Sequence, residues 1–290
     1  MPELRDKAGI TIQRSTRASD LRSFWLPGLA FLLITLVAII YGLNPGISWA
    51  GLRPSPCYPG CFCEAFQRGA IIQPLSSYSN LWYVLVGLGI IASARISLPG
   101  DGTRTNYLLR QSFYIIVYGL AAIFIGLTSF FYHVSLTLVG RWADYMGMYA
   151  LASFAVAFNL VRLGIVRGRA FAIIFTALNL SLAIPMMAVS SLIVKRALLM
   201  GTILIMIGLE GIIFLIRQPP RLRYIYLISA LGILTAATGV NLLDESGRWC
   251  SHTSLWQWHA VWHFLTAVSI SLLFLYYRTE DDRKRQSDQV

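Results

Sequence analysis

Charged side chains are scarce in this chain. Only 13% of its 290 residues are Asp, Glu, Lys or Arg, whereas 56% are hydrophobic and the mean hydropathy is +0.62. An average soluble domain carries about 25% charged residues, so the composition excludes an ordinary soluble protein. The chain also has no internal repeat and no low-complexity segment. We therefore expect an all-α, polytopic membrane protein.

Long apolar runs locate the expected transmembrane helices. A bilayer is crossed by about 20 apolar residues in a helix, and eight runs of that kind can be found. They are residues 24–43, 77–96, 113–137, 143–161, 170–193, 197–216, 224–243 and 255–277. Pro185 is expected to kink the fifth span. The first span is longer than the apolar part of a signal peptide, so we expect it to remain as an uncleaved anchor.

Acidic residues are fewer than basic ones, which gives a net charge of +11. A basic protein can bind nucleic acid, but here the positive charges sort by side of the membrane. If the N-terminus is cytoplasmic, six of the 24 basic residues fall in external segments: Arg53, Arg68, Arg141, Lys195, Arg196 and Arg248. The remainder are cytoplasmic, as the positive-inside rule requires. The charge therefore predicts both termini in the cytoplasm and no nucleic-acid partner.

Cysteine is rare, and its four positions are all external in this topology. Cys57, Cys61 and Cys63 precede the second span, and Cys250 precedes the eighth. Disulfides persist in oxidising compartments, so we expect a bridge between the first cluster and Cys250. A metal site made by these cysteines with His252 is the alternative. External cysteines with basic inner segments favour a bacterial inner membrane over a eukaryotic endomembrane.

Histidine is equally rare, and three of the four histidines lie in apolar runs. His259 and His263 are four residues apart, so in a helix they share one face and both can bind one ion. His133 is the candidate third ligand. Three protein ligands with an open position are typical of catalytic zinc. For a single membrane histidine, an interhelical hydrogen bond is the alternative.

Two further polar residues are expected at the same depth as the histidines. Ser129 precedes His133 by one turn, and Asp144 follows in the next span, so both lie near the external boundary. The set predicts a zinc hydrolase in which Asp144 transfers a proton from water and Ser129 hydrogen-bonds the water or the oxyanion. The alternatives are that Ser129 bonds the Ile125 carbonyl and that Asp144 stabilises a helix N-terminus.

Burial in the membrane implies a lipid substrate, such as an amide or ester of a long-chain acid. A receptor with a structural zinc and a metal or proton transporter are the competing functions. A transporter needs ionisable residues along a path through the membrane. Glu210 is the other deep acid in the spans, and pairing with Arg217 accounts for it without a functional role.

Two segments carry a family resemblance. Gly126-Leu-Thr-Ser129-Phe-Phe-Tyr-His133, followed by Asp144, and His259-Ala-Val-Trp-His263 together resemble the alkaline ceramidase family. This family belongs to a superfamily of seven-helix membrane hydrolases that includes adiponectin and progestin receptors. Cys63-Glu64 and Gln73-Pro-Leu-Ser-Ser-Tyr-Ser79-Asn80-Leu are similar to the family's N-terminal signature. The resemblance runs from about residue 63 to residue 277.

The resemblance implies a role for each candidate residue. Zinc would be held by His133, His259 and His263, assisted by Ser129 and Asp144, and Cys63 would pair with Cys250. The activity implied is hydrolysis of ceramide or a related N-acyl lipid to a fatty acid and a long-chain amine. Residues 77–277 would form the seven-helix catalytic domain. The rest would be a basic cytoplasmic segment (1–23), an additional helix (24–43), an external loop (44–76) and a cytoplasmic tail (278–290).

One departure from the family pattern concerns calcium. Eukaryotic members have an acidic cluster built on Asp-Trp-Cys-Glu-x-Asn and a later Glu. Here Phe62 precedes Cys63, only Glu64 remains of the acids, and Gln73 stands near the position of the later Glu. We therefore expect no calcium cofactor, and the sequence leaves the oligomeric state open.

Overall fold

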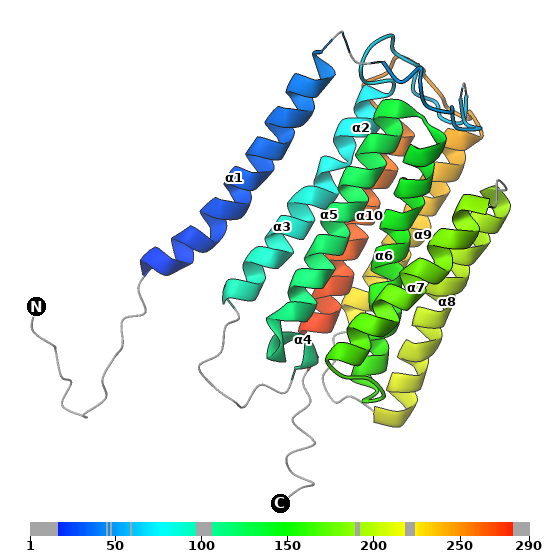
Figure 1. Cartoon of the computed structure of the whole chain (residues 1–290). Helices are drawn as coiled ribbons and strands as arrows, with labels where there is room; N and C mark the ends of the chain where they lie inside the picture. Colours follow the sequence, from blue (N-terminus) through cyan, green and yellow to red (C-terminus); the bar gives the residue numbers. More distant parts are fainter. Residues whose placement is uncertain are drawn as a thin grey trace, which may run out of the picture.

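The fold is a bundle of helices. The computed structural model describes residues 17–44, 46, 48–58, 60–96, 106–188, 192–217 and 224–280. These residues form helices and no strand: α1 (Arg17–Gly42), α2 (Pro74–Ser79), α3 (Leu81–Ile96), α4 (Tyr107–Arg110), α5 (Ser112–Ser135), α6 (Leu138–Arg162), α7 (Arg169–Ala188), α8 (Leu192–Arg217), α9 (Tyr224–Glu245) and α10 (Trp258–Arg278). Figure 1 shows the long helices side by side, with α1 at the edge. The predicted all-α class is confirmed.

Seven helical stretches in the described residues are long and apolar enough to cross a membrane. They are Pro74–Ala94, Ser112–Ser135, Leu138–Arg162, Arg169–Met187, Ile193–Ile216, Tyr224–Glu245 and Trp258–Arg278. The first predicted span, residues 24–43, lies in α1, whose described apolar part, Leu26–Gly42, is shorter and which packs against α3. Leu32, Leu204 and Leu215 are among many apolar side chains exposed on the outside of the bundle. Such a surface suits lipid rather than water, so this is an integral membrane protein.

Helices α1, α6 and α8 each begin several residues before the predicted apolar run, and the last two bear on the site. Helix α6 begins at Leu138 rather than at residue 143, because Thr137 is its N-cap and accepts a hydrogen bond from the Gly140 N–H at 3.1 Å. Helix α8 begins at Leu192 rather than at residue 197. The placement of Arg141, Lys195 and Arg196 in loops was therefore wrong, since all three belong to helices.

Helix α7 runs through Pro185 to Ala188. Most of the predicted basic segment 1–23 and of the tail 278–290 lies outside the described residues.

Glycines allow α3, α5 and α6 to approach closely. A Cβ atom added to Gly119 would lie 2.8 Å from the Gly87 carbonyl oxygen, so the backbones of α5 and α3 are nearly in contact there. On the other side of α5, a Cβ atom at Gly147 of α6 would lie 2.8 Å from the Ile125 Cα. Small residues at helix contacts are a common means of close packing in membranes. This packing brings the residues near Gly147 on α6 against α5.

Disulfides fasten the end of the bundle at which the chain segments 43–73 and 246–257 lie, which we call the loop end (top of Figure 1). Cys63 is bonded to Cys250, the pairing that the resemblance implied, and Cys57 is bonded to Cys61, which sequence reasoning did not foresee. The alternative of a cysteine metal site is therefore not adopted. His252 instead hydrogen-bonds the Cys63 carbonyl through Nδ1 at 2.8 Å.

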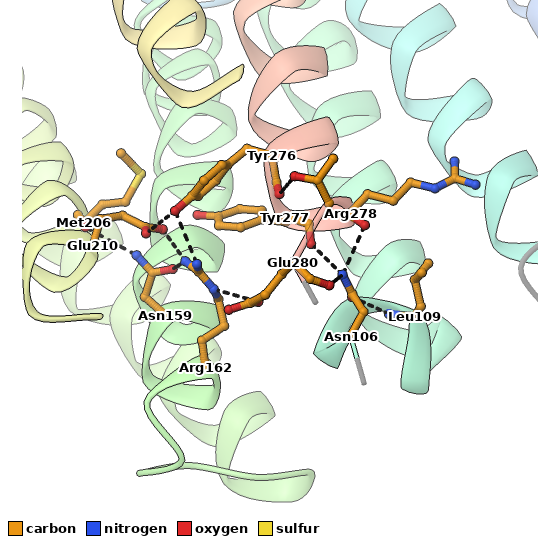
Figure 2. Close-up of polar contacts among 11 residues, drawn as sticks. Asn106, Leu109, Asn159, Arg162, Met206, Glu210, Tyr276, Tyr277, Arg278 and Glu280 are labelled. Carbon is orange, nitrogen blue, oxygen red and sulfur yellow. Dashed lines mark hydrogen bonds and ion pairs between the residues drawn. The ribbon is translucent and has the colours of Figure 1, made fainter. Parts of the chain in front are cut away.

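A buried polar network fastens the opposite end of the bundle (Figure 2). The Arg162 guanidinium is paired with Glu210 and with Glu280, the latter at 3.0 Å, and Tyr276 donates its hydroxyl to Glu210 at 2.8 Å. The Asn106 amide caps α10 by donating to the carbonyls of Tyr277 at 3.0 Å and Arg278 at 3.1 Å. Glu210 is thus paired with Arg162, and the expected pairing with Arg217 falls on a side chain outside the described part.

Candidate metal centre and its cavity

Three histidines meet near the loop end. Helix α5 carries His133 in its last turn, and α10 carries His259 and His263 in its first two turns. All three side chains are buried, and their candidate ligand atoms lie within 4.8 Å of one another. The Nε2 atoms of His133 and His259 are 3.1 Å apart. The structure thus brings together the three residues that the sequence nominated as metal ligands.

Hydrogen bonds fix which ring nitrogen of two histidines carries the proton. His133 Nδ1 lies 2.9 Å from the Gln73 Oε1, an acceptor, so Nδ1 bears the hydrogen and Nε2 keeps its lone pair. His263 Nδ1 lies 2.7 Å from the Ser79 hydroxyl, which donates its own hydrogen to the Ser76 carbonyl. His263 must then donate as well, which again leaves Nε2 free. This arrangement, with the outer nitrogen bonded and the inner one open, is typical of metal-binding histidines.

The set fits a metal cation on physical grounds. Two imidazole nitrogens at 3.1 Å repel each other if both present lone pairs, unless a positive charge lies between them. No ion pair involves a histidine among the described residues, and the buried His259 Nδ1 has no hydrogen-bond partner there. Three neutral nitrogen donors suit zinc and other divalent transition metals.

The short helix α2 is the support of this centre. Gln73, which bonds His133, immediately precedes α2, and Ser79, which bonds His263, is the last residue of α2. The Glu64 carboxylate accepts hydrogen bonds from the N–H groups of Leu75 at 2.7 Å and Ser76 at 2.8 Å. A carboxylate at this position satisfies the free N–H groups of a helix N-terminus. Glu64 therefore fixes the helix that orients two of the histidines.

Ser129 and Asp144 lie beside each other next to the histidines. Ser129 of α5 and Asp144 of α6 line the same cavity, and the Ser129 hydroxyl is close enough to stabilise the Asp144 carboxylate electrostatically. Neither alternative is adopted: the Ile125 carbonyl accepts a hydrogen bond from Thr128 at 3.2 Å, and Asp144 lies well inside α6, whose N-cap is Thr137. The close contact between Gly147 and Ile125 keeps α6 against α5 beside these two residues.

Phe62 covers the histidines from the loop end. Its ring centroid lies 4.3 Å from that of His259 and 5.1 Å from that of His133. The disulfides Cys57–Cys61 and Cys63–Cys250 fasten the chain on both sides of it. Sequence reasoning noted Phe62 only as a departure from a signature and found no role for it. Its position follows from the fold of the loop, for which residue spacing carries no signal.

His259, His263, Ser129 and Asp144 line a cavity of about 460 Å³. Its wall away from the loop end is shared with a second, apolar hollow of about 140 Å³ between α6, α8, α9 and α10. Met148, Leu199 and Met200 belong to both walls. The space therefore has a polar part at the candidate metal centre and an apolar part that extends along the bundle.

The fold and the site define a polytopic membrane protein with a buried three-histidine centre that opens into a partly apolar cavity. A family model described as Ceramidase matches residues 63–289, and the chain belongs to this family. Membership supports an amidase that acts on ceramide, a lipid substrate. A search of curated proteins found no match to the chain.

Proposed function

We propose that this protein is a zinc-dependent amidase that hydrolyses ceramide or a related N-acyl lipid inside the membrane, releasing a fatty acid and a long-chain amine. The observation that carries the proposal is that Asp144 lines one cavity with His259 and His263, two members of the three-histidine cluster, and that this cavity continues into an apolar hollow. His133, His259 and His263 would hold the ion. Zinc supplies Lewis acidity, which favours the ionisation of water and polarises an amide carbonyl near neutral pH.

The side chains of the chain would move the protons of the reaction. Asp144 accepts a proton from the attacking water and delivers it to the amide nitrogen as the C–N bond breaks. Ser129 holds the Asp144 carboxylate in one orientation through its hydroxyl and donates to the oxyanion when it turns to the substrate. Phe62 restricts bulk water at the centre. The atoms balance, because one water is consumed for each acid and amine released.

The apolar hollow offers a binding place for the acyl chain of the lipid substrate. Helix α8 packs against α6 and α9 packs against α10, and the hollow lies between these pairs. We place the acyl chain there and the entry of the substrate between α8 and α9, directly from the bilayer. By the positive-inside rule we place both termini in the cytoplasm and the centre near the external or lumenal face, in a bacterial inner membrane. Residues 77–277 would form the catalytic domain.

The competing functions gain no support from the site. A transporter needs ionisable groups along a path across the membrane, but Glu210 is held by Arg162 and does not line the cavity. A receptor with a structural zinc has no need of an acid beside the ion, and Asp144 lines the same cavity as His259 and His263.

The test combines lipid cleavage with metal content. Purified protein is assayed with labelled ceramides, dihydroceramides, N-acyl amino lipids and lysolipids, and bound zinc is measured by elemental analysis. We expect His259→Ala to lose both zinc and activity, and Asp144→Asn to keep zinc but lose turnover. His252→Ala is the matched control, because His252 lies outside the centre. Zinc at one per chain without cleavage of any lipid would overturn the proposal, and full activity in Asp144→Asn would remove Asp144 from it.

A further inference from the structure

The cavity is lined by a buried arginine that forms no ion pair within the described residues. Arg141 lies on α6, one turn before Asp144, and lines the cavity, although the residue is only 3% exposed. Among the described residues, its guanidinium makes no ion pair and no hydrogen bond. A buried charge is costly unless it is paired, so an unpaired buried guanidinium facing a cavity requires an explanation.

The neighbouring charges leave Arg141 without an ion pair. Asp144 is near enough to Arg141 for the two charges to attract each other, but the two side chains form no ion pair. Lys195, on α8, is 2% exposed and lies near enough to Arg141 for the two positive charges to repel each other. Its Nζ is over the ring of Tyr145, at 5.9 Å from the centroid. The ring is a weaker partner for a cation than a carboxylate is.

A third cation in the same region is already paired. Arg196 of α8 forms an ion pair with Glu245 of α9, and both line the cavity. The Asn241 amide also donates to Glu245, at 3.0 Å. This pair joins α8 to α9 at the loop end and leaves Glu245 unavailable to Arg141. Neither Arg141 nor Lys195 therefore has a carboxylate in ion-pair contact among the described residues, and Asp144 is the acid closest in sequence to Arg141.

We propose that Arg141, supported by Lys195, binds an anionic group on the substrate, so that the preferred lipid is an N-acyl amine carrying a phosphate or a carboxylate near its amide bond. The inference rests on the proposed amidase function and names its substrate class. The geometry is consistent with the apolar hollow, because Arg141 lies on the loop-end side of Asp144 and the hollow extends the other way. The anion and the acyl chain thus occupy opposite ends of one cavity. Arg is well suited to such a group, because its planar guanidinium bonds phosphate or carboxylate with two donors.

The test compares lipids that differ only in the anion. Ceramide is paired with ceramide 1-phosphate, and an N-acylethanolamine with the N-acylglycine of the same chain length. For at least one pair, we expect kcat/KM to be about tenfold or more higher for the anionic lipid, the effect of one charged hydrogen bond. The pair that shows the preference distinguishes phosphate from carboxylate. Equal or faster cleavage of the neutral lipid in both pairs would overturn the inference and leave the amidase function standing.

Variants connect the preference to Arg141. In Arg141→Gln we expect the anionic-to-neutral ratio to fall toward one, with Arg141→Lys intermediate. Arg248→Gln is the matched control, because Arg248 is an exposed cation of the loop end that does not line the cavity. A ratio that persists in Arg141→Gln would refute the assignment.

Binding separates this inference from failure of the proposed reaction. Native mass spectrometry of the zinc-depleted protein with ceramide and with ceramide 1-phosphate or N-acylglycine requires no turnover. We expect more anionic lipid than neutral lipid to remain bound, and expect Arg141→Gln to remove the difference. Equal retention of all these lipids by the wild-type protein would overturn the inference even if no lipid were cleaved.

Discussion

Replacing Gln73 by leucine removes the acceptor that orients His133 while keeping a side chain of similar size. The Gln73 Oε1 lies 2.9 Å from the His133 Nδ1, and both residues are almost fully buried. In Gln73→Leu the His133 N–H is left without a partner, at a cost of about 1–3 kcal/mol. Loss of such an outer partner weakens metal binding by about 10- to 100-fold. We expect that decrease in zinc affinity, with a parallel loss of activity at limiting zinc.

The assay is competition for zinc between the purified protein and a chelator of known affinity, with thermal unfolding followed in parallel. Gln73→Glu retains an acceptor oxygen, so we expect it to bind zinc more tightly than Gln73→Leu does. Ser77→Ala is the matched control, since the Ser77 hydroxyl donates to the Gln73 carbonyl at 2.6 Å but does not touch a histidine. Wild-type zinc affinity in Gln73→Leu would refute the assignment of Gln73 as a positioning residue.

Two further predictions concern the helices. In Gly147→Ala the new Cβ lies 2.8 Å from the Ile125 Cα and pushes α6 from α5, and a displacement of Asp144 of about 1 Å would lower turnover by about 100-fold. The control Gly208→Ala, whose new Cβ meets no atom within 4 Å, should retain wild-type kinetics. Equal turnover in both variants would contradict the packing argument. In Arg162→Met the acids Glu210 and Glu280 lose their buried cation (Figure 2), so we expect the free energy of unfolding to fall by about 3–5 kcal/mol, measured as a lower midpoint of thermal unfolding. Adding Glu210→Gln should restore part of this stability. An unchanged midpoint in Arg162→Met would show that the network does not stabilise the fold.

The helices were predictable because hydropathy averaged over a span depends little on any one residue. The polar beginnings of helices were not predictable in this way. Arg141 in α6 lowers the local hydropathy, so the predicted span started after it. The same holds for α2, which begins at Pro74, before the second apolar run at residue 77. Whether an arginine at such a boundary lies in a loop or faces a cavity depends on the neighbouring helices, which composition does not describe.

The residues of the candidate site also differ in whether a local sequence pattern could predict them. His259 and His263 were recognisable because helical spacing alone places them on one face, and His133 followed from depth and from the family resemblance. Phe62 and Gln73 reach the histidines through the folding of a loop and the start of a short helix. Their contacts depend on the long-range disulfide and on Glu64, so no local pattern in the sequence contains them.

The position of α10 has a consequence for the biosynthesis of the protein. This last helix supplies two of the three histidines, the residue that follows it closely completes the charge network with Arg162, and the cysteine that precedes it closes the longer disulfide. Before α10 is inserted, the earlier helices thus provide a single histidine of the centre, Cys63 is without its disulfide partner, and Glu210 is the one acid paired with Arg162. The chain therefore gains its metal centre and the completed fastening of both ends in one late step, when the final span joins the bundle. Until that step, a partly synthesised chain has only one of its three candidate zinc ligands in place.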